Sequence, residues 1–82
     1  MKNLEELIGK TISQYDGWNG SDKYLVIDQI VIEQGTIGFI SKSKNVHVWL
    51  PTLAIDDLIN NGIHIKSNEI DHCPYQVITE IL

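Results

Sequence analysis

The sequence predicts an α+β protein that is rich in β-strands: a small, mostly antiparallel sheet or a partly open barrel of five to six strands. One inserted helix at about residues 52–61 and a short N-terminal helical turn complete the expected fold. Runs of β-branched and aromatic residues recur along the chain, separated by clusters of Gly, Asn, Asp and Ser. Only the segment after Pro51 combines an apolar stripe of helical spacing with start and stop residues. The 82 residues suffice for a single domain over residues 1–82, which needs most of its apolar side chains for the core.

The N-terminus is expected to form a short helical turn followed by a strand. Asn3 is a typical N-cap, Glu6 stands three residues later in the capping-box position, and Gly9 ends the turn. Residues 10–15 are the first predicted strand. The segment at 16–22 consists of turn-forming residues apart from one tryptophan.

The β-branched segment at residues 23–34 is predicted to be strand, with a bulge or bend where the polar pair at 28–29 interrupts its alternation. The dipeptide at 34–35, Gln-Gly, favours a two-residue hairpin turn. That turn sets the register of the hairpin. The resulting cross-strand apolar pairs are Ile32 with Ile37 and Ile30 with Phe39.

A polar loop at residues 41–45 leads to a strand at 46–50. Three apolar side chains of this strand share one face, and His47 and Trp49 share the other. The favoured interpretation places Trp49 in the core. The proline that follows stops the strand.

The inserted helix is expected to begin at Thr52, its predicted N-cap. Asp56 and Asp57 then lie near the positive end of the helix dipole. The Asn-Gly pair at 61–62 ends the helix.

The C-terminal third is predicted as a short strand at 63–66, a polar crossing at 67–74 and a final strand at 75–82. The last strand carries apolar residues on both faces. An exposed strand of this kind is prone to aggregation unless it is paired or covered. We therefore expect it in the centre of the sheet or at the interface of a symmetric homo-oligomer.

Charge argues against direct nucleic-acid binding. Eleven acidic residues oppose six lysines, there is no arginine, and the net charge is −5. Proteins that bind nucleic acid directly neutralise phosphates with clustered cations, often arginines. The acidic residues are spread along the chain, as on a solvated surface.

The expected location is the cytoplasm, without membrane contact. A single cysteine allows no internal disulfide, which a secreted domain this small usually needs. Charged residues interrupt the N-terminus too early for a signal peptide. No apolar run approaches the ~20 residues of a membrane span.

Neither a metal site, a cofactor site nor a catalytic site is predicted. His47 and His64 are isolated on strands, and the adjacent His72 and Cys73 point in opposite directions. Cys73 is expected to be a small, half-buried apolar side chain rather than a nucleophile. The chain is therefore expected to bind a partner and not to be an enzyme.

Aromatic residues outside the expected core are the main candidates for binding. Trp18 lies in a glycine-rich loop, either as an anchor for a partner or planar ligand or as a lid over a small core. The predicted ligand- or partner-binding residues are Trp18, Asn19, Gly20, Tyr24, His47, Trp49, Thr52 and Asp56.

Two patches of the chain resemble a small phage family of Thoeris anti-defence proteins. Those proteins open with a short helix, a Gly-Lys strand, a Trp-Asn-Gly loop and an apolar strand, and later carry a Trp, a Ser or Thr three residues on, and an Asp in a helical turn. The matching segments are Gly9-Lys10-Thr11-Ile12, Gly17-Trp18-Asn19-Gly20 and Tyr24-Leu25-Val26-Ile27, followed by Trp49, Thr52 and Asp56.

The resemblance implies a homo-oligomeric protein that sequesters a cyclic nucleotide immune signal without cleaving it. Trp18 would stack on a base, and loop N–H groups with Lys10 or Lys23 would meet phosphate. The match departs from the family in the spacing between Gly9 and Trp18, which is one residue longer. It leaves residues 67–82 without a counterpart.

The composition alone favours an alternative, because small acidic proteins without a catalytic signature are typical of protein inhibitors. Anti-CRISPR proteins and immunity proteins that neutralise a toxin are of this type. Such proteins bind basic clefts through scattered carboxylates and one or two aromatic anchors. The expected partner is therefore either a cyclic nucleotide or another protein.

Overall fold

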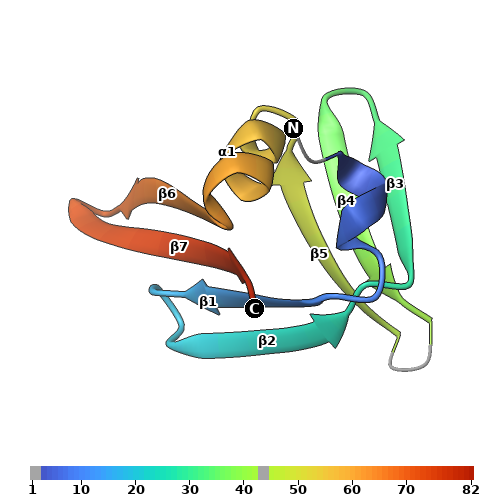
Figure 1. The fold of residues 1–82 in the computed structure, drawn as a ribbon. Coiled ribbons are helices and arrows are strands. Elements are labelled where there is room, and N and C mark those ends of the chain that lie inside the picture. Colours follow the sequence, from blue (N-terminus) through green and yellow to red (C-terminus); the bar gives the residue numbers. More distant parts are fainter. Residues whose placement is uncertain (1–2, 43–44) are drawn as a thin grey trace.

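The structure, a computed structural model, describes residues 3–42 and 45–82 (Figure 1). These residues form two antiparallel sheets and one α-helix, which confirms the predicted strand-rich α+β class. The elements are the 3-10 turn η1 (Leu4–Leu7), β1 (Thr11–Asp16), β2 (Ser21–Val26), β3 (Gln29–Glu33), β4 (Thr36–Ser41), β5 (Val46–Pro51), α1 (Ala54–Asn61), β6 (Ile63–Ile70) and β7 (Cys73–Ile81). The four-stranded sheet has the order β2-β1-β7-β6 and the three-stranded sheet the order β3-β4-β5, and neither closes into a barrel.

A bend after β2 divides the predicted long strand into two and accounts for the seventh strand. Ile27 is fully buried, and its N–H donates to the carbonyl oxygen of Lys10 at 2.9 Å. The next N–H, of Asp28, donates to the carbonyl oxygen of Ile40 at 2.9 Å. The Asp28 carboxylate accepts the Lys42 N–H at 3.1 Å. The chain therefore leaves the four-stranded sheet at Ile27 and joins the three-stranded sheet after Asp28, where the sequence predicted a bulge or bend.

The β3–β4 hairpin has the predicted turn and register. Gln34 and Gly35 have φ values of 38° and 81°, the positive values that a type I′ turn requires. The observed pairs include Ile32 with Ile37 and Ile30 with Phe39. A two-residue turn thus sets which face of the three-stranded sheet is apolar.

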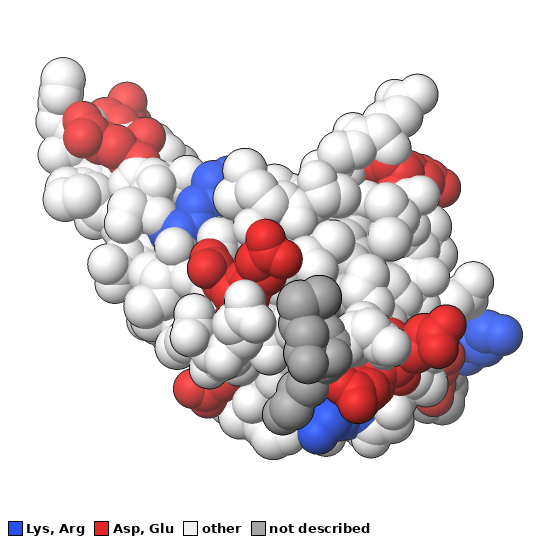
Figure 2. All heavy atoms as spheres, turned by 45° about the horizontal axis from the view of Figure 1, so that its top comes forward, with Lys and Arg blue, Asp and Glu red and all other residues white. Residues whose placement is uncertain are grey.

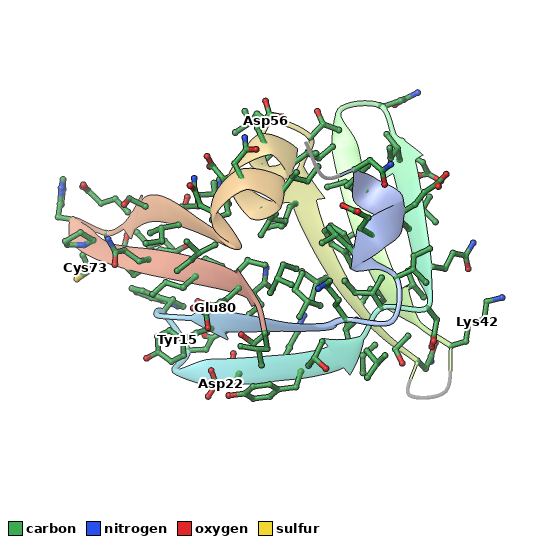
Figure 3. The ribbon with its side chains drawn as sticks, in the orientation of Figure 1. Tyr15, Asp22, Lys42, Asp56, Cys73 and Glu80 are labelled. Carbon is green, nitrogen blue, oxygen red and sulfur yellow. The ribbon has the colours of Figure 1, made fainter. Side chains whose placement is uncertain are left out.

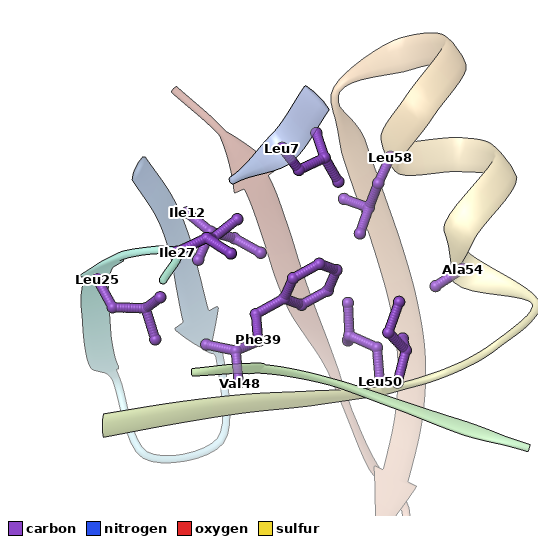
Figure 4. Close-up of a cluster of buried hydrophobic side chains, with 10 residues drawn as sticks. Leu7, Ile12, Leu25, Ile27, Phe39, Val48, Leu50, Ala54 and Leu58 are labelled. Carbon is purple, nitrogen blue, oxygen red and sulfur yellow. The ribbon is translucent and has the colours of Figure 1, made fainter. Parts of the chain in front are cut away.

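The core lies between the two sheets, and η1 and α1 close its open side (Figure 4). Phe39 of β4 is its largest fully buried side chain. Val48 and Leu50 face inward from β5, as the alternation predicted. The buried hydrophobic residues are Leu7, Ile12, Leu25, Ile27, Ile37, Phe39, Val48, Leu50, Ala54 and Leu58.

The N-terminal turn lies where the sequence predicted it. The Asn3 N–H donates to the Glu6 carboxylate at 3.2 Å. Leu7 is buried against the core, and Gly9, with φ of 91°, directs the chain into β1.

The predicted cap of α1 is wrong, although the helix itself is present. The helix begins at Ala54, and no side chain among residues 3–42 and 45–82 caps its N-terminus. Thr52 is held by its backbone: its N–H donates to the carbonyl oxygen of Gly35 at 2.9 Å, and its own carbonyl accepts the Ile55 N–H at 3.0 Å. The bond to Gly35 ties Thr52 to the β3–β4 turn. Gly62 ends the helix as predicted, with φ of 74°.

The predicted polar crossing at 67–74 is wrong, because β6 and β7 form one continuous hairpin. Asp71 and His72 have φ values of 50° and 65° and make a two-residue turn. Cys73 follows at the hairpin tip and is exposed, not half-buried as predicted (Figure 3). β7 lies between β1 and β6, so the predicted central position of the last strand is confirmed.

The surface carries acidic groups on several elements. Figure 2 shows them around a hollow between the β6–β7 hairpin and the β3–β4 hairpin. Residues 43 and 44 of the predicted loop at 41–45 lie outside the described residues.

In the part of the chain that the structure describes, no helix is long and apolar enough to cross a membrane.

Phe39→Ala is expected to lower the free energy of unfolding by about 3–5 kcal/mol, because it leaves a cavity at the centre of the core. Ile32→Ala is the matched control: it lies on the same hairpin but is 57% exposed, and its expected cost is below about 1 kcal/mol. Urea denaturation followed by tryptophan fluorescence measures both. Equal losses would contradict the described core.

Candidate functional site

The side of the four-stranded sheet that faces away from the core is an exposed surface, here called the outer face. Ile12, Leu25, His64 and Thr79 point inward from the four strands. Because successive side chains of a strand alternate, their neighbours lie on the outer face. Those neighbours are Thr11, Ser13 and Tyr15; Asp22, Tyr24 and Val26; Ile63, Ile65, Ser67 and Glu69; and Pro74, Gln76, Ile78 and Glu80.

An apolar row crosses the outer face. Tyr15 of β1 pairs with Ile78 of β7, which pairs with Ile65 of β6. Tyr24 of β2 lies one pair along from Tyr15 on the same face. Tyr15, Tyr24 and Ile65 are 41%, 57% and 50% exposed. Large exposed side chains in register across a sheet are typical of a binding surface.

The charges on the outer face all have one sign. Asp22, Glu69 and Glu80 lie on it. Lys23 and Lys66 point to the opposite side of their strands, as their alternation requires. Among the described residues of the four strands, the outer face therefore combines three carboxylates with no lysine.

A pocket of about 480 Å³ opens on this face beside the β1–β2 loop. It is lined by residues of three strands: Tyr15, Ser67, Pro74, Tyr75, Gln76 and Ile78. Gly17 completes the lining: its N–H donates to the carbonyl oxygen of Gln76 at 2.8 Å. A Cβ on Gly17 would stand 2.6 Å from that same oxygen, so the close packing of the loop on β7 requires glycine.

Asp16 organises the loop that contains the predicted binding motif. Its carboxylate accepts the Trp18 N–H at 2.9 Å and the Asn19 side-chain amide at 3.3 Å. Its carbonyl accepts the Gly20 N–H at 2.8 Å. The Trp18 N–H, one of the loop donors that were expected to meet phosphate, therefore already donates to a negatively charged group.

Of the two lysines that were expected to meet phosphate, Lys10 lies away from the loop. Lys10 precedes β1 and Trp18 follows it, and a six-residue strand separates its ends by about 20 Å. Lys23 follows the loop in β2 and points to the side opposite the outer face.

Trp18 lies outside the core, so its interpretation as a core lid is wrong. It is 47% exposed. Its ring centroid lies 5.6 Å from that of Tyr75, with the two ring planes at 51°. This contact holds the indole against the first part of β7.

The other predicted residues form a separate group on the three-stranded sheet and α1. Trp49 was expected in the core but is 45% exposed. It pairs with Gly38, where a Cβ would stand 2.6 Å from the indole ring, so the ring lies over the space that this glycine leaves. His47 shares its face. Asp56 is exposed on α1, well away from Tyr15 in Figure 3.

One buried polar contact was not predicted. His64 of β6 is buried, and its Nδ1 lies 2.9 Å from a carboxylate oxygen of Asp57. Its Nε2 is buried without a partner among the described residues. The contact joins α1 to the four-stranded sheet, which is a structural role.

Comparison with protein-family models, curated proteins and solved structures finds no match to this chain. The chemistry of the outer face is therefore the basis for assigning its function. Its residues Tyr15, Asp22, Ile65 and Ile78 were not among the predicted binding residues. The two-sided apolar pattern of the last strand was a signal for Ile78 alone.

Trp18→Ala is expected to change the free energy of unfolding by less than about 1 kcal/mol, because the side chain is half exposed and contacts one ring. Denaturant melting measures the change. A loss of about 3 kcal/mol or more would show that the indole is part of the core.

Gly17→Ala is expected to destabilise the protein by about 1–3 kcal/mol, because the added methyl group collides with the β7 backbone. Amide hydrogen exchange should show faster exchange at residue 17, and the β3–β4 hairpin serves as the internal control. Unchanged exchange at residue 17 would contradict the described packing.

Proposed function

We propose that this chain is a non-catalytic binding protein of the inhibitor type, which covers a cationic surface of another protein with its outer face. The observation that carries the proposal is the row of exposed Tyr15 and Ile65 with half-buried Ile78 between them, flanked by carboxylates and without lysine among the described residues. Tyrosine is a typical hot-spot residue, and the aliphatic side chains add apolar contact area. The uniform negative charge favours a basic partner and speeds its association.

The composition of the pocket supports binding rather than catalysis. A nucleophilic mechanism needs a nucleophile, a base and a group that orients the base. The pocket lining contains no histidine, carboxylate or thiol. Its hydroxyl and amide groups are suited to hydrogen bonding with a partner.

Sequestration of a cyclic nucleotide is the competing function, which the family resemblance implies. The Trp18–Tyr75 ring pair favours it, because exposed aromatic rings stack on bases. Asp16 weighs against it, because its carboxylate already accepts the Trp18 N–H. Lys10 lies at the other end of β1, so a phosphate at the loop would meet this negative charge without that cation.

Self-association through the outer face is disfavoured for the same electrostatic reason. Two copies that met face to face would bring Asp22, Glu69 and Glu80 of each toward those of the other. Like charges across an interface oppose binding. We therefore assign the outer face to a different protein and not to a second copy.

Site-specific photo-crosslinking tests the proposal. Benzoylphenylalanine in place of Tyr24 is expected to capture one cationic protein from cells, while the same group in place of Trp49 does not. The captured protein is then purified and its dissociation constant measured with the unmodified chain. Tyr15→Ala should weaken the complex by about 2 kcal/mol, or about 30-fold.

Two results would contradict this function. Capture from position 49 and not from position 24 would move the site to the three-stranded sheet. A rise in melting temperature with cyclic dinucleotides or cyclic ADP-ribose isomers, which linkage requires of a tight ligand, would favour sequestration.

A further inference from the structure

We propose that the pocket beside the β1–β2 loop receives an arginine side chain of the protein partner. This inference rests on the proposed function for its biological context, but the pocket can be tested alone. It assigns the anchoring contact on the outer face to a guanidinium group.

The pocket has the size and walls for a long, planar side chain. Its volume of about 480 Å³ is within the range of ligand pockets. Tyr15 supplies an aromatic wall, and Pro74 and Ile78 supply apolar ones. Such walls bury the methylene stem of a cationic side chain and offer a ring face to its charge.

Carboxylates border the pocket on two sides. Asp22 pairs with Tyr15 across β1 and β2, and Figure 3 shows the two side chains on neighbouring strands. Glu69 pairs with Pro74 across β6 and β7. Directly paired side chains of antiparallel strands lie about 5 Å apart at Cβ, so both carboxylates are within reach of a cation in the pocket.

Arginine fits this arrangement better than lysine. A guanidinium group stacks flat on a tyrosine ring and still directs N–H donors sideways, toward acceptors such as the Ser67 hydroxyl and the Gln76 side-chain oxygen. A lysine ammonium group is compact and strongly hydrated, so it gains less from an aromatic wall. The chain itself has no arginine that could occupy the pocket.

The Glu69 carboxylate also has a neighbour in its own hairpin. His72 Nδ1 lies 3.7 Å from a carboxylate oxygen of Glu69.

The test uses a blocked peptide, Gly-Gly-Arg-Gly-Gly, and versions with lysine or citrulline in place of arginine. Each is titrated into the whole chain at pH 7.5, and amide chemical shifts are followed by NMR. The arginine peptide is expected to shift the signals of Tyr15, Gly17 and Ile78. Its affinity should exceed that of the lysine peptide by about two- to five-fold, and the neutral citrulline peptide should bind least.

Charge-matched variants separate a local site from general attraction. Asp22→Asn and Glu69→Gln should each weaken the arginine peptide by about two- to five-fold, as expected for an exposed ion pair. Glu33→Gln also removes one negative charge, but from the three-stranded sheet and not from the outer face. It should leave the affinity for the arginine peptide unchanged. Tyr15→Phe should retain binding, and Tyr15→Ala should lose most of it.

The outcomes distinguish the inference from the proposed function. Equal binding of the arginine and citrulline peptides, or equal losses in Glu33→Gln and Asp22→Asn, would overturn the arginine pocket. If the crosslinked partner still bound through the outer face, the proposed function would stand without the arginine pocket. Peptide binding as expected, with no partner captured from position 24, would retain the pocket and overturn the function.

Discussion

The fold depends on the bend at Ile27 and Asp28, where the chain passes from one sheet to the other. Consecutive backbone groups there bond in two directions, to Lys10 beside β1 and to Ile40 at the end of β4. The buried Ile27 side chain holds the bend against the core. Because the chain turns at this point, the three-stranded sheet covers one side of the four-stranded sheet and leaves the other side exposed.

The two sides of the four-stranded sheet therefore lie in different environments. On the inner side, Ile12 and Leu25 contribute to the core and Thr79 and His64 make a polar margin near α1. On the outer face, Tyr15 and Ile65 remain exposed and Ile78 between them is half-buried, although burying each fully would favour folding. A domain this small has few apolar residues to spare, and this exposure in register supports the proposed binding of a partner.

Local patterns in the sequence predicted the elements well and predicted long-range placement poorly. The β3–β4 register followed from Gln34-Gly35, because Gly readily adopts the positive φ of that turn. The β6–β7 turn carried no such signal, since Asp71 and His72 adopt positive φ without a glycine. Trp49 was placed in the core from its size alone, because the space over Gly38 depends on pairing between β4 and β5. Three of the eight predicted site residues, Trp18, Asn19 and Gly20, are together for a local reason, the glycine-rich loop, whereas Tyr15 and Ile78 come together only through the β1–β7 pairing.

The β1–β7 pairing also affects the order in which the strands can pair during synthesis. It joins Ile12 to Ile81, nearly the full length of the chain apart, whereas each pairing in the three-stranded sheet joins consecutive strands. Contacts distant in sequence close late and slow the folding of small domains. On the ribosome, the meander of β3, β4 and β5 can therefore assemble while β1 still lacks its central neighbour. The pocket, which needs Tyr15 and Ile78 together, is absent until β7 has been synthesised and has paired with β1.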